Sequence, residues 1–171
     1  PNSPFHMLPL EILRQLPAMI RENEYQVTTL SLMDQLTGVE PGNTAEIFFG
    51  IAVDIGTTTL AAYLYDLVNG DRLAVASMLN PQIKYGADVI SRIDHASQSN
   101  DHSAEMANLI RSALNELIER LIQTRRLDRR DIYLVTLAGN TTMLHLLLQL
   151  PVIQLARSPF IPVLLTTLFL K

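Results

Sequence analysis

The spacing of apolar residues sets a short first block, residues 1–45, apart from the rest of the chain. Between residues 8 and 23 the apolar positions recur near helical spacing, although Pro17 must kink or divide such a helix. Val27 to Leu32 predicts a strand, and Glu40 to Asn43 predicts a turn. A block of this length is too small to hold a core of its own, so we expect it to be the end of a preceding domain.

From residue 46 onward the pattern predicts a meander of three strands. The first strand covers about 46–54, and the second covers Thr59 to Asp66. Asn69–Gly70 is the strongest short hairpin signal, and it connects the second strand to a third near Arg72 to Met78.

Two helices are predicted after the meander. The first covers about Tyr85 to Ala96, and a polar break from Gln98 to Ser103 separates it from the second. The second helix is long and amphipathic, because its apolar residues lie three and four positions apart and form one stripe. The stripe consists of Met106, Leu109, Ile110, Ala113, Leu114, Leu117, Ile118, Leu121 and Ile122. Such a stripe is typical of core packing.

A near-continuous apolar run, Ile132 to Ala138, predicts a further strand. Runs without alternation are typical of central, parallel strands that are buried on both faces. The run ends at Gly139–Asn140–Thr141–Thr142, which opens a short helix from Met143 to Leu150 that Pro151 stops. The element order β-β-β-α-β-α predicts an α/β fold of the ribonuclease-H-like type over residues 46–163. Actin, the heat-shock chaperone ATPases and the sugar kinases share this arrangement.

The charge of the chain argues against a nucleic-acid partner. The formal net charge is −4 and the pI is near 5.5, which leaves no basic footprint for nucleic acid. Six of the 13 basic residues are arginines between Arg111 and Arg130, but Glu116, Glu119 and Asp128 lie in the same segment. We therefore expect that segment to be a solvated helix face and its exit turn.

Cysteine and histidine usage restricts the possible cofactors. The chain has no cysteine, which excludes a disulfide scaffold and any thiolate-ligated zinc or iron–sulfur site within it. The four histidines show no metal-ligand spacing. The most apolar region, Met143 to Leu170, is interrupted by three prolines and Arg157, so it does not predict a membrane span. We expect a soluble, cytoplasmic chain.

The stretch Gly50 to Thr59 holds the most informative polar residues. An apolar run ends in Asp54, and Gly56 and three threonines, Thr57, Thr58 and Thr59, follow. Gly56 can take positive φ at little cost, so successive backbone N–H groups can form an anion-binding nest, and the hydroxyls add donors. An aspartate beside a phosphate fits only if Mg²⁺ lies between them. We interpret this stretch as a nucleotide phosphate loop; a tight hairpin with threonines chosen for β propensity stays open as an alternative.

Two polar clusters are expected at the same edge of the sheet. Asp54 ends the first strand of the meander, and Gly139–Asn140 ends the fourth strand. Ligands of open α/β sheets gather at the carboxyl ends of strands, so these clusters should converge. Nucleases of the same fold need several carboxylates for two metal ions, whereas the fourth strand ends in Gly-Asn-Thr-Thr. The pattern favours ATP over a nuclease reaction.

The flanking motifs resemble a known family. Gly50 to Leu60 is similar to the first phosphate motif of the acetate and sugar kinase, heat-shock chaperone and actin superfamily. Asn80 to Ile93, Ala138 to Met143 and Ser158 to Pro162 resemble the reductive activators of corrinoid-dependent methyltransferase systems. The resemblance implies an ATPase that reduces a Co(II) corrinoid protein back to Co(I). It also implies a [2Fe-2S] centre in the parent protein, outside this cysteine-free chain.

The resemblance further implies roles for individual residues. Asp54 would orient Mg²⁺ through water, as the catalytic and metal-site residue. Gly56 would admit the phosphates of ATP closely, and Thr57 and Thr58 would hydrogen-bond them, while Thr59 points into the next strand. Gly139 and Asn140 would line the cleft near the γ-phosphate. Thr141 would cap the following helix, and capping alone is an alternative role for that cluster.

Within the segment Asn80 to Ile93, two charged residues have an ambiguous spacing. Asp88 and Arg92 stand four positions apart, which predicts an ion pair on a helix surface. Docking of a partner is the functional alternative for this segment.

The resemblance also implies how the chain relates to its parent. Residues 1–45 would be the end of a small α/β middle domain, and 46–163 the first half of an actin-like ATPase domain. Residues 164–171 are unlike the family's continuation. We therefore expect a fragment that binds ATP weakly or not at all. Another ATP-binding protein of the superfamily, such as a small-molecule kinase, and an inactive truncation stay open as alternatives.

Overall fold

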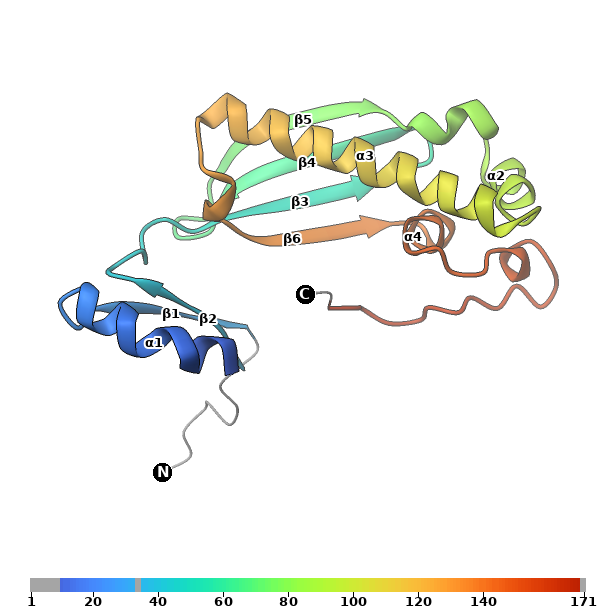
Figure 1. Ribbon diagram of the computed structural model, residues 1–171. Helices are drawn as coiled ribbons and strands as arrows, with labels where there is room; N and C mark the ends of the chain where they lie inside the picture. The colour runs from blue at the N-terminus through green and yellow to red at the C-terminus, as the bar shows by residue number, and fades with distance from the viewer. Residues whose placement is uncertain (1–9, 33–34, 170–171) are drawn as a thin grey trace. The chain divides into compact units, whose positions relative to one another are not determined.

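The computed structural model describes residues 10–32 and 35–169, and the chain divides into two compact units at Phe48 and Phe49. The first unit contains helix α1 (Leu10–Glu22) and the antiparallel strands β1 (Val27–Leu32) and β2 (Gln35–Pro41) (Figure 1). The predicted strand is confirmed, and the predicted helix is confirmed over residues 10–22, where Pro17 does not divide it; residues 8 and 9 lie outside the described residues. Among the described residues of this unit, Leu36 is the only buried one, which agrees with a block that holds little core of its own.

Strand β2 is not predicted by the sequence pattern. Gly38 lies within it, and Pro41 ends it opposite Val27, a terminal position where the missing N–H of proline is tolerated. The turn expected at 40–43 therefore begins only after Pro41. Gly42, with φ of +72°, supplies the left-handed backbone conformation of that turn.

The second unit is built on a four-stranded sheet in the order β5-β4-β3-β6. Strands β3 (Phe49–Ile55), β4 (Thr59–Asp66) and β5 (Arg72–Leu79) form the predicted antiparallel meander, and β6 (Ile132–Gly139) runs parallel to β3 (Figure 1). The mixed α/β fold and the order of its elements are confirmed.

Two helix boundaries differ from the prediction because polar caps lie elsewhere. A 3₁₀ turn covers Pro81–Tyr85, and α2 (Val89–Ala96) begins only after Asp88, whose carboxylate accepts a hydrogen bond from the N–H of Ser91. Helix α3 (Asn100–Arg125) is capped by Ser99, so it begins inside the expected polar break. Helix α4 (Thr141–Leu148) follows β6, as predicted.

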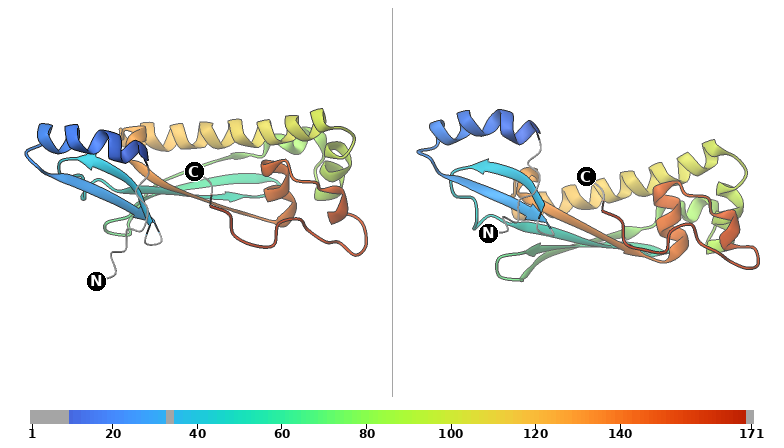
Figure 2. Two further views of the ribbon diagram at one scale, coloured as in Figure 1. Left: turned by 60° about the horizontal axis from the view of Figure 1, so that its bottom comes forward. Right: turned by 90° about the horizontal axis from the view of Figure 1, so that it is seen from below.

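The core of the second unit lies between α3 and one face of the sheet. Figure 2 shows α3 running along that face. The sheet contributes Ile51, Val53, Ile55, Leu60, Ala62 and Leu64, and the helices contribute Met106, Ile110, Leu117, Leu121, Met143 and Leu146. All six sheet residues are 3% exposed or less, so the ends of β3 and β4 are fixed by tight packing.

The predicted position of β6 is wrong in one respect. The strand is parallel, but in the described part of the chain it lies at the edge of the sheet rather than at its centre. Leu134 and Val135, on opposite faces, are 39% and 43% exposed. An uninterrupted apolar run indicates a strand that can be buried on both faces, but it does not specify which helices or strands pack against those faces.

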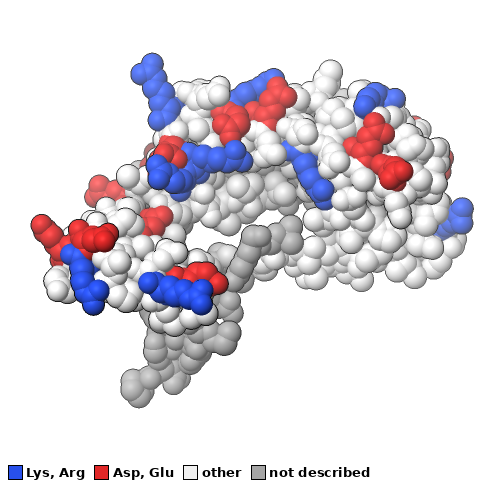
Figure 3. All heavy atoms as spheres, in the orientation of Figure 1, with Lys and Arg blue, Asp and Glu red and all other residues white. Residues whose placement is uncertain are grey.

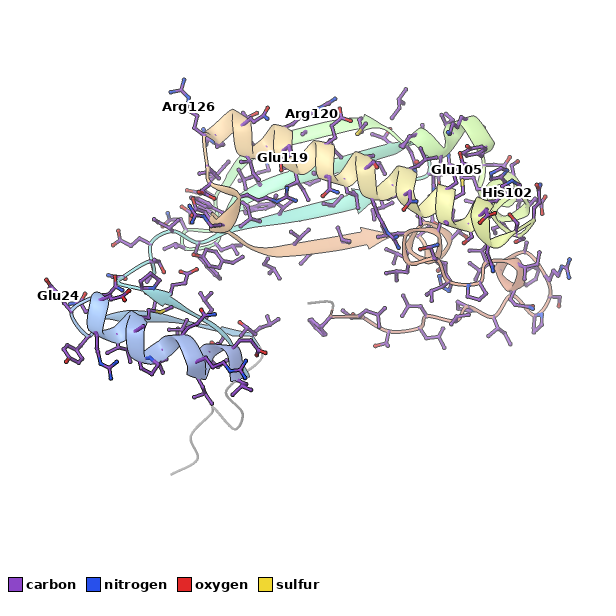
Figure 4. The ribbon with its side chains drawn as sticks, viewed as in Figure 1. Glu24, His102, Glu105, Glu119, Arg120 and Arg126 are labelled. Atoms are coloured by element: carbon purple, nitrogen blue, oxygen red, sulfur yellow. The ribbon has the colours of Figure 1, made fainter. Side chains whose placement is uncertain are left out.

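The arginine-rich end of α3 is a solvated surface, as predicted. Glu116 pairs with Arg120 at 2.5 Å, and Glu119 pairs with Arg129 at 2.7 Å. Figure 3 shows both signs of charge interspersed over α3, and Figure 4 labels Glu119 and Arg120 on that helix. Exposed pairs of this kind contribute little to stability. Within residues 10–32 and 35–169, none of the helices has the length and apolar character needed to cross a membrane.

Candidate functional site

The turn from Gly56 to Thr59 connects β3 to β4 at the end of the sheet. The Gly56 N–H donates a hydrogen bond to the Thr59 carbonyl oxygen at 3.0 Å. A Cβ added to Gly56 would lie 2.5 Å from that oxygen, so the turn requires glycine for space. Gly56 is not among the glycines with positive φ, and its N–H is already used. The expected nest around a left-handed Gly56 is therefore wrong, because the residue closes the turn instead.

The donors that remain free in this turn belong to the threonines. In the described part of the chain, the backbone N–H groups of Thr57 and Thr58 have no hydrogen-bond partner. Thr58 and Thr59 are exposed, and Thr57 is half-buried. The carbonyl of Thr59 is used inside the turn, which agrees with a structural role for that residue. The two free N–H groups and the neighbouring hydroxyls can bind an anion.

Asp54 presents an unpaired carboxylate beside this turn. It is exposed, and among the described residues its side chain has no hydrogen bond or ion pair. Its cross-strand neighbours are Ala61 on β4 and Ala138 on β6. The described residues contain no group of three or more side chains that could hold a metal ion by themselves. A cation at this carboxylate would therefore need further oxygen ligands from water or a phosphate.

The second polar cluster meets the first, as predicted. The Asn140 side-chain N–H₂ group donates a hydrogen bond to Thr57 Oγ1 at 3.1 Å. The other end of the same side chain, Oδ1, accepts from the N–H of Met143 at 3.0 Å. Asn140 is thus the N-cap of α4, and Thr141, expected in that role, is the first helical residue and exposed. The correction follows from reach, because an N-cap side chain binds the N–H three residues ahead.

Gly139 allows the two strands to end close together. A Cβ at this position would lie 2.9 Å from the carbonyl oxygen of Ile55, its neighbour on β3. Glycine therefore permits the close approach that lets Asn140 reach Thr57.

The combined site fits a magnesium-bound phosphate group. Mg²⁺ is held through carboxylate and water oxygens, and Asp54 is an exposed carboxylate without a partner among the described residues. Phosphate oxygens accept from backbone N–H groups and favour the N-terminus of a helix, which α4 places beside Thr57. The donor set is therefore of the kind that a nucleotide phosphate site requires.

One residue behind this turn, Asn80, was not predicted to belong to the site. Asn80 is completely buried and donates from its side chain to the Gly56 carbonyl oxygen at 2.8 Å. An asparagine directly before Pro81 is typical of a helix cap, and that signal could have placed it at the end of β5.

Arg92 does not form the expected surface ion pair with Asp88. Its guanidinium is completely buried and donates to the Gly86 carbonyl oxygen at 2.9 Å and to Met143 Sδ at 3.4 Å. Burial lowers the pKa of Arg92, while the charge of Asp88 acts in the opposite direction. Asp88 itself caps α2.

Known proteins are similar to large parts of this chain. Residues 49–171 match the family model described as the RACo middle region. The match includes residues 164–171, which we expected to be unlike the family's continuation. The corrinoid activation enzyme RamQ of Eubacterium limosum is 42% identical over 113 residues, which is 66% of this chain and 19% of that protein. A solved structure, a reductive activator for a corrinoid, iron–sulfur protein, superposes with a TM-score of 0.84 at 32% identity. That superposition covers 92% of this chain and 26% of the activator.

The chain therefore spans only 19% to 26% of the length of these relatives. The resemblance to reductive activators of corrinoid proteins, expected from the motifs, is confirmed. On the match over residues 49–171, the chain belongs to the RACo middle-region family.

Proposed function

We propose that this chain provides the phosphate-binding part of a Mg·ATP site in a protein that reactivates corrinoid proteins. The observation that carries the proposal is the hydrogen bond between Asn140 and Thr57, which joins the two polar clusters beside the unpaired carboxylate of Asp54. The fold and the order of its elements support an actin-like ATPase subdomain.

Each residue of the site would contribute one part of nucleotide binding. Asp54 would hold Mg²⁺ through water, and the free N–H groups of Thr57 and Thr58 would bind phosphate oxygens. Gly139 and Asn140 would border the γ-phosphate, together with the N-terminus of α4. Hydrolysis of bound Mg·ATP would release free energy. The residues of the site would orient the phosphates and hold the Mg²⁺ that balances their charge.

The reaction that this ATP use would drive is the reduction of a Co(II) corrinoid to Co(I). Both relatives are named as activators of corrinoid systems, and this supports the same substrate class here. The electron would come through a [2Fe-2S] centre, which must lie outside these 171 residues because they contain no cysteine. A nucleotide-dependent change of conformation could then bias the cobalt equilibrium toward reduction. The partner would be a corrinoid protein of a methyltransferase system.

Titration of the chain with Mg·ATP, followed by NMR amide shifts, tests the phosphate site. NMR registers affinities on the order of 1 mM, which suits an incomplete site. We expect binding that needs Mg²⁺, and Asp54→Asn should remove the metal dependence and weaken binding about tenfold. Asp71→Asn is the matched control, since Asp71 is exposed in the turn at the opposite end of the sheet. Equal Mg²⁺-dependent binding by wild type and Asp54→Asn would contradict the proposal.

The reaction itself is tested in a full-length activator that carries these residues. Mixed with ATP and a Co(II) corrinoid protein, it should produce the absorption band of Co(I). Phosphorylation of a small molecule without cobalt reduction would instead support a kinase.

A further inference from the structure

Asn80 uses every polar group of its side chain beneath the phosphate turn. The residue is completely buried. Its Oδ1 accepts from the N–H of Gln82 at 3.0 Å, and its Nδ2 donates to the Gly56 carbonyl oxygen at 2.8 Å. Its backbone N–H donates to the Thr58 carbonyl oxygen, also at 2.8 Å. One residue therefore binds two carbonyl groups of the four-residue turn.

These two hydrogen bonds determine where the N–H groups of the turn point. In a trans peptide the C=O and the following N–H point in opposite directions. The Gly56 carbonyl points toward Asn80, so the Thr57 N–H points away from it. This is one of the two N–H groups that lack a partner in the described part of the chain. The orientation of a free phosphate donor is thus set by a side chain that lies behind it.

Asn80 is itself held by a rigid surrounding. Its Nδ2 also lies 3.7 Å from Met143 Sδ on α4, the same sulfur to which Arg92 donates. Gln82, next to Asn80 in the 3₁₀ turn, donates from Nε2 to the Met106 carbonyl oxygen on α3 at 2.9 Å. Asn80 itself therefore contacts α4 and the β3–β4 turn, whereas the contact with α3 belongs to Gln82.

We propose that Asn80 is a positioning residue for phosphate binding. Its side-chain amide holds the Gly56–Thr57 peptide in the orientation that leaves the Thr57 N–H free for a phosphate oxygen. The consequence for nucleotide binding rests on the proposed function, whereas the effect on the turn does not.

Asn80→Asp separates the donor from the acceptor of this side chain. The carboxyl keeps an acceptor for Gln82. When protonated it can donate to the Gly56 carbonyl, and when ionised it repels that oxygen. Relative to wild type, Mg·ATP binding by the ionised Asn80→Asp variant should weaken about tenfold, because its carboxylate cannot donate to the Gly56 carbonyl oxygen.

Three further variants separate positioning from stability. Asn80→Ser keeps a helix-capping oxygen but cannot reach Gly56, so its binding should weaken about tenfold at every pH. Gln82→Met removes a buried hydrogen bond in the same 3₁₀ turn, and it should lower Tm while leaving binding within about twofold of wild type. Asn115→Asp makes the same chemical change on the exposed face of α3 and should alter neither property.

Amide hydrogen exchange tests the inference independently of nucleotide. The Gly56 N–H, bonded to Thr59, should exchange at least about tenfold faster in Asn80→Ser than in Gln82→Met. If wild type fails to bind Mg·ATP but this difference appears, the proposed function is refuted and the inference stands. Unchanged Gly56 exchange in both Asn80 variants would overturn the inference. A binding ratio for Asn80→Asp equal to that of Gln82→Met would also overturn it.

Discussion

Replacing Asn140 separates the two hydrogen bonds that connect β6, α4 and the β3–β4 turn. Asn140→Ala removes both the cap of Met143 N–H, at 3.0 Å, and the bond to Thr57, at 3.1 Å. Loss of an N-cap costs about 1 kcal/mol, and loss of an exposed side-chain hydrogen bond costs about 0.5 to 1 kcal/mol. The free energy of unfolding should therefore fall by about 1.5 to 2 kcal/mol.

Asn140→Asp keeps the cap and loses only the donor to Thr57. A carboxylate at the N-terminus of α4 gains about 0.3 to 1 kcal/mol from the helix dipole, which offsets the lost bond. We expect stability within about 0.5 kcal/mol of wild type. Mg·ATP binding should nevertheless weaken by at least about tenfold, because the new charge lies beside the phosphate position.

Urea denaturation followed by circular dichroism measures the first quantity, and NMR titration with Mg·ATP measures the second. If Asn140→Asp were as unstable as Asn140→Ala, the capping assignment would be refuted. If it bound Mg·ATP as wild type does, the phosphate would not lie next to Asn140.

Two further predictions concern the turn and the surface. Gly56→Ala places a Cβ 2.5 Å from the Thr59 carbonyl oxygen, so we expect a loss of about 1 to 3 kcal/mol in urea denaturation, and an unchanged midpoint would show that the turn can move freely. Arg130 lowers the pKa of Asp128 from 3.8 to about 2, through its side chain first and its backbone N–H second. Because the folded pKa is lowered, this interaction stabilises the protein above pH 4 or so and is lost as pH falls toward 2. A carboxyl NMR titration should show a midpoint near 2 that rises toward 3.8 in Arg130→Gln, and a midpoint near 3.8 in wild type would contradict the pairing.

The sequence predicts the site residues that lie at the ends of regular strands. The carboxylate after an apolar run and the Gly-Asn pair after another are local signals, and two parallel strands must bring them to one edge. The hydrogen bond between Asn140 and Thr57 shows that the two clusters meet at that edge.

Local sequence patterns do not predict the roles of residues whose contacts lie far away in the sequence. Arg92 has the spacing of a surface ion pair with Asp88, yet the packing of α2 against α4 buries it beside Met143. Asn80 is separated from Gly56 by 24 positions, so no local pattern connects them. The exposure of β6 depends on what lies beside the strand, which its own apolar run does not encode.

The role of Gly56 shows a different kind of limit. Glycine serves either a left-handed backbone or a close approach, and from the sequence we expected the first at Gly56. The 2.5 Å distance from its Cβ position to the Thr59 carbonyl oxygen identifies the second reason.

The central claim is that phosphates bind where β3 and β6 end, and amide shifts in a Mg·ATP titration test it most directly. The largest changes should fall on Thr57, Thr58 and Asn140, and they should vanish when Mg²⁺ is omitted. Changes confined to other parts of the chain, or none at these three amides with Mg·ATP in large excess, would contradict the account.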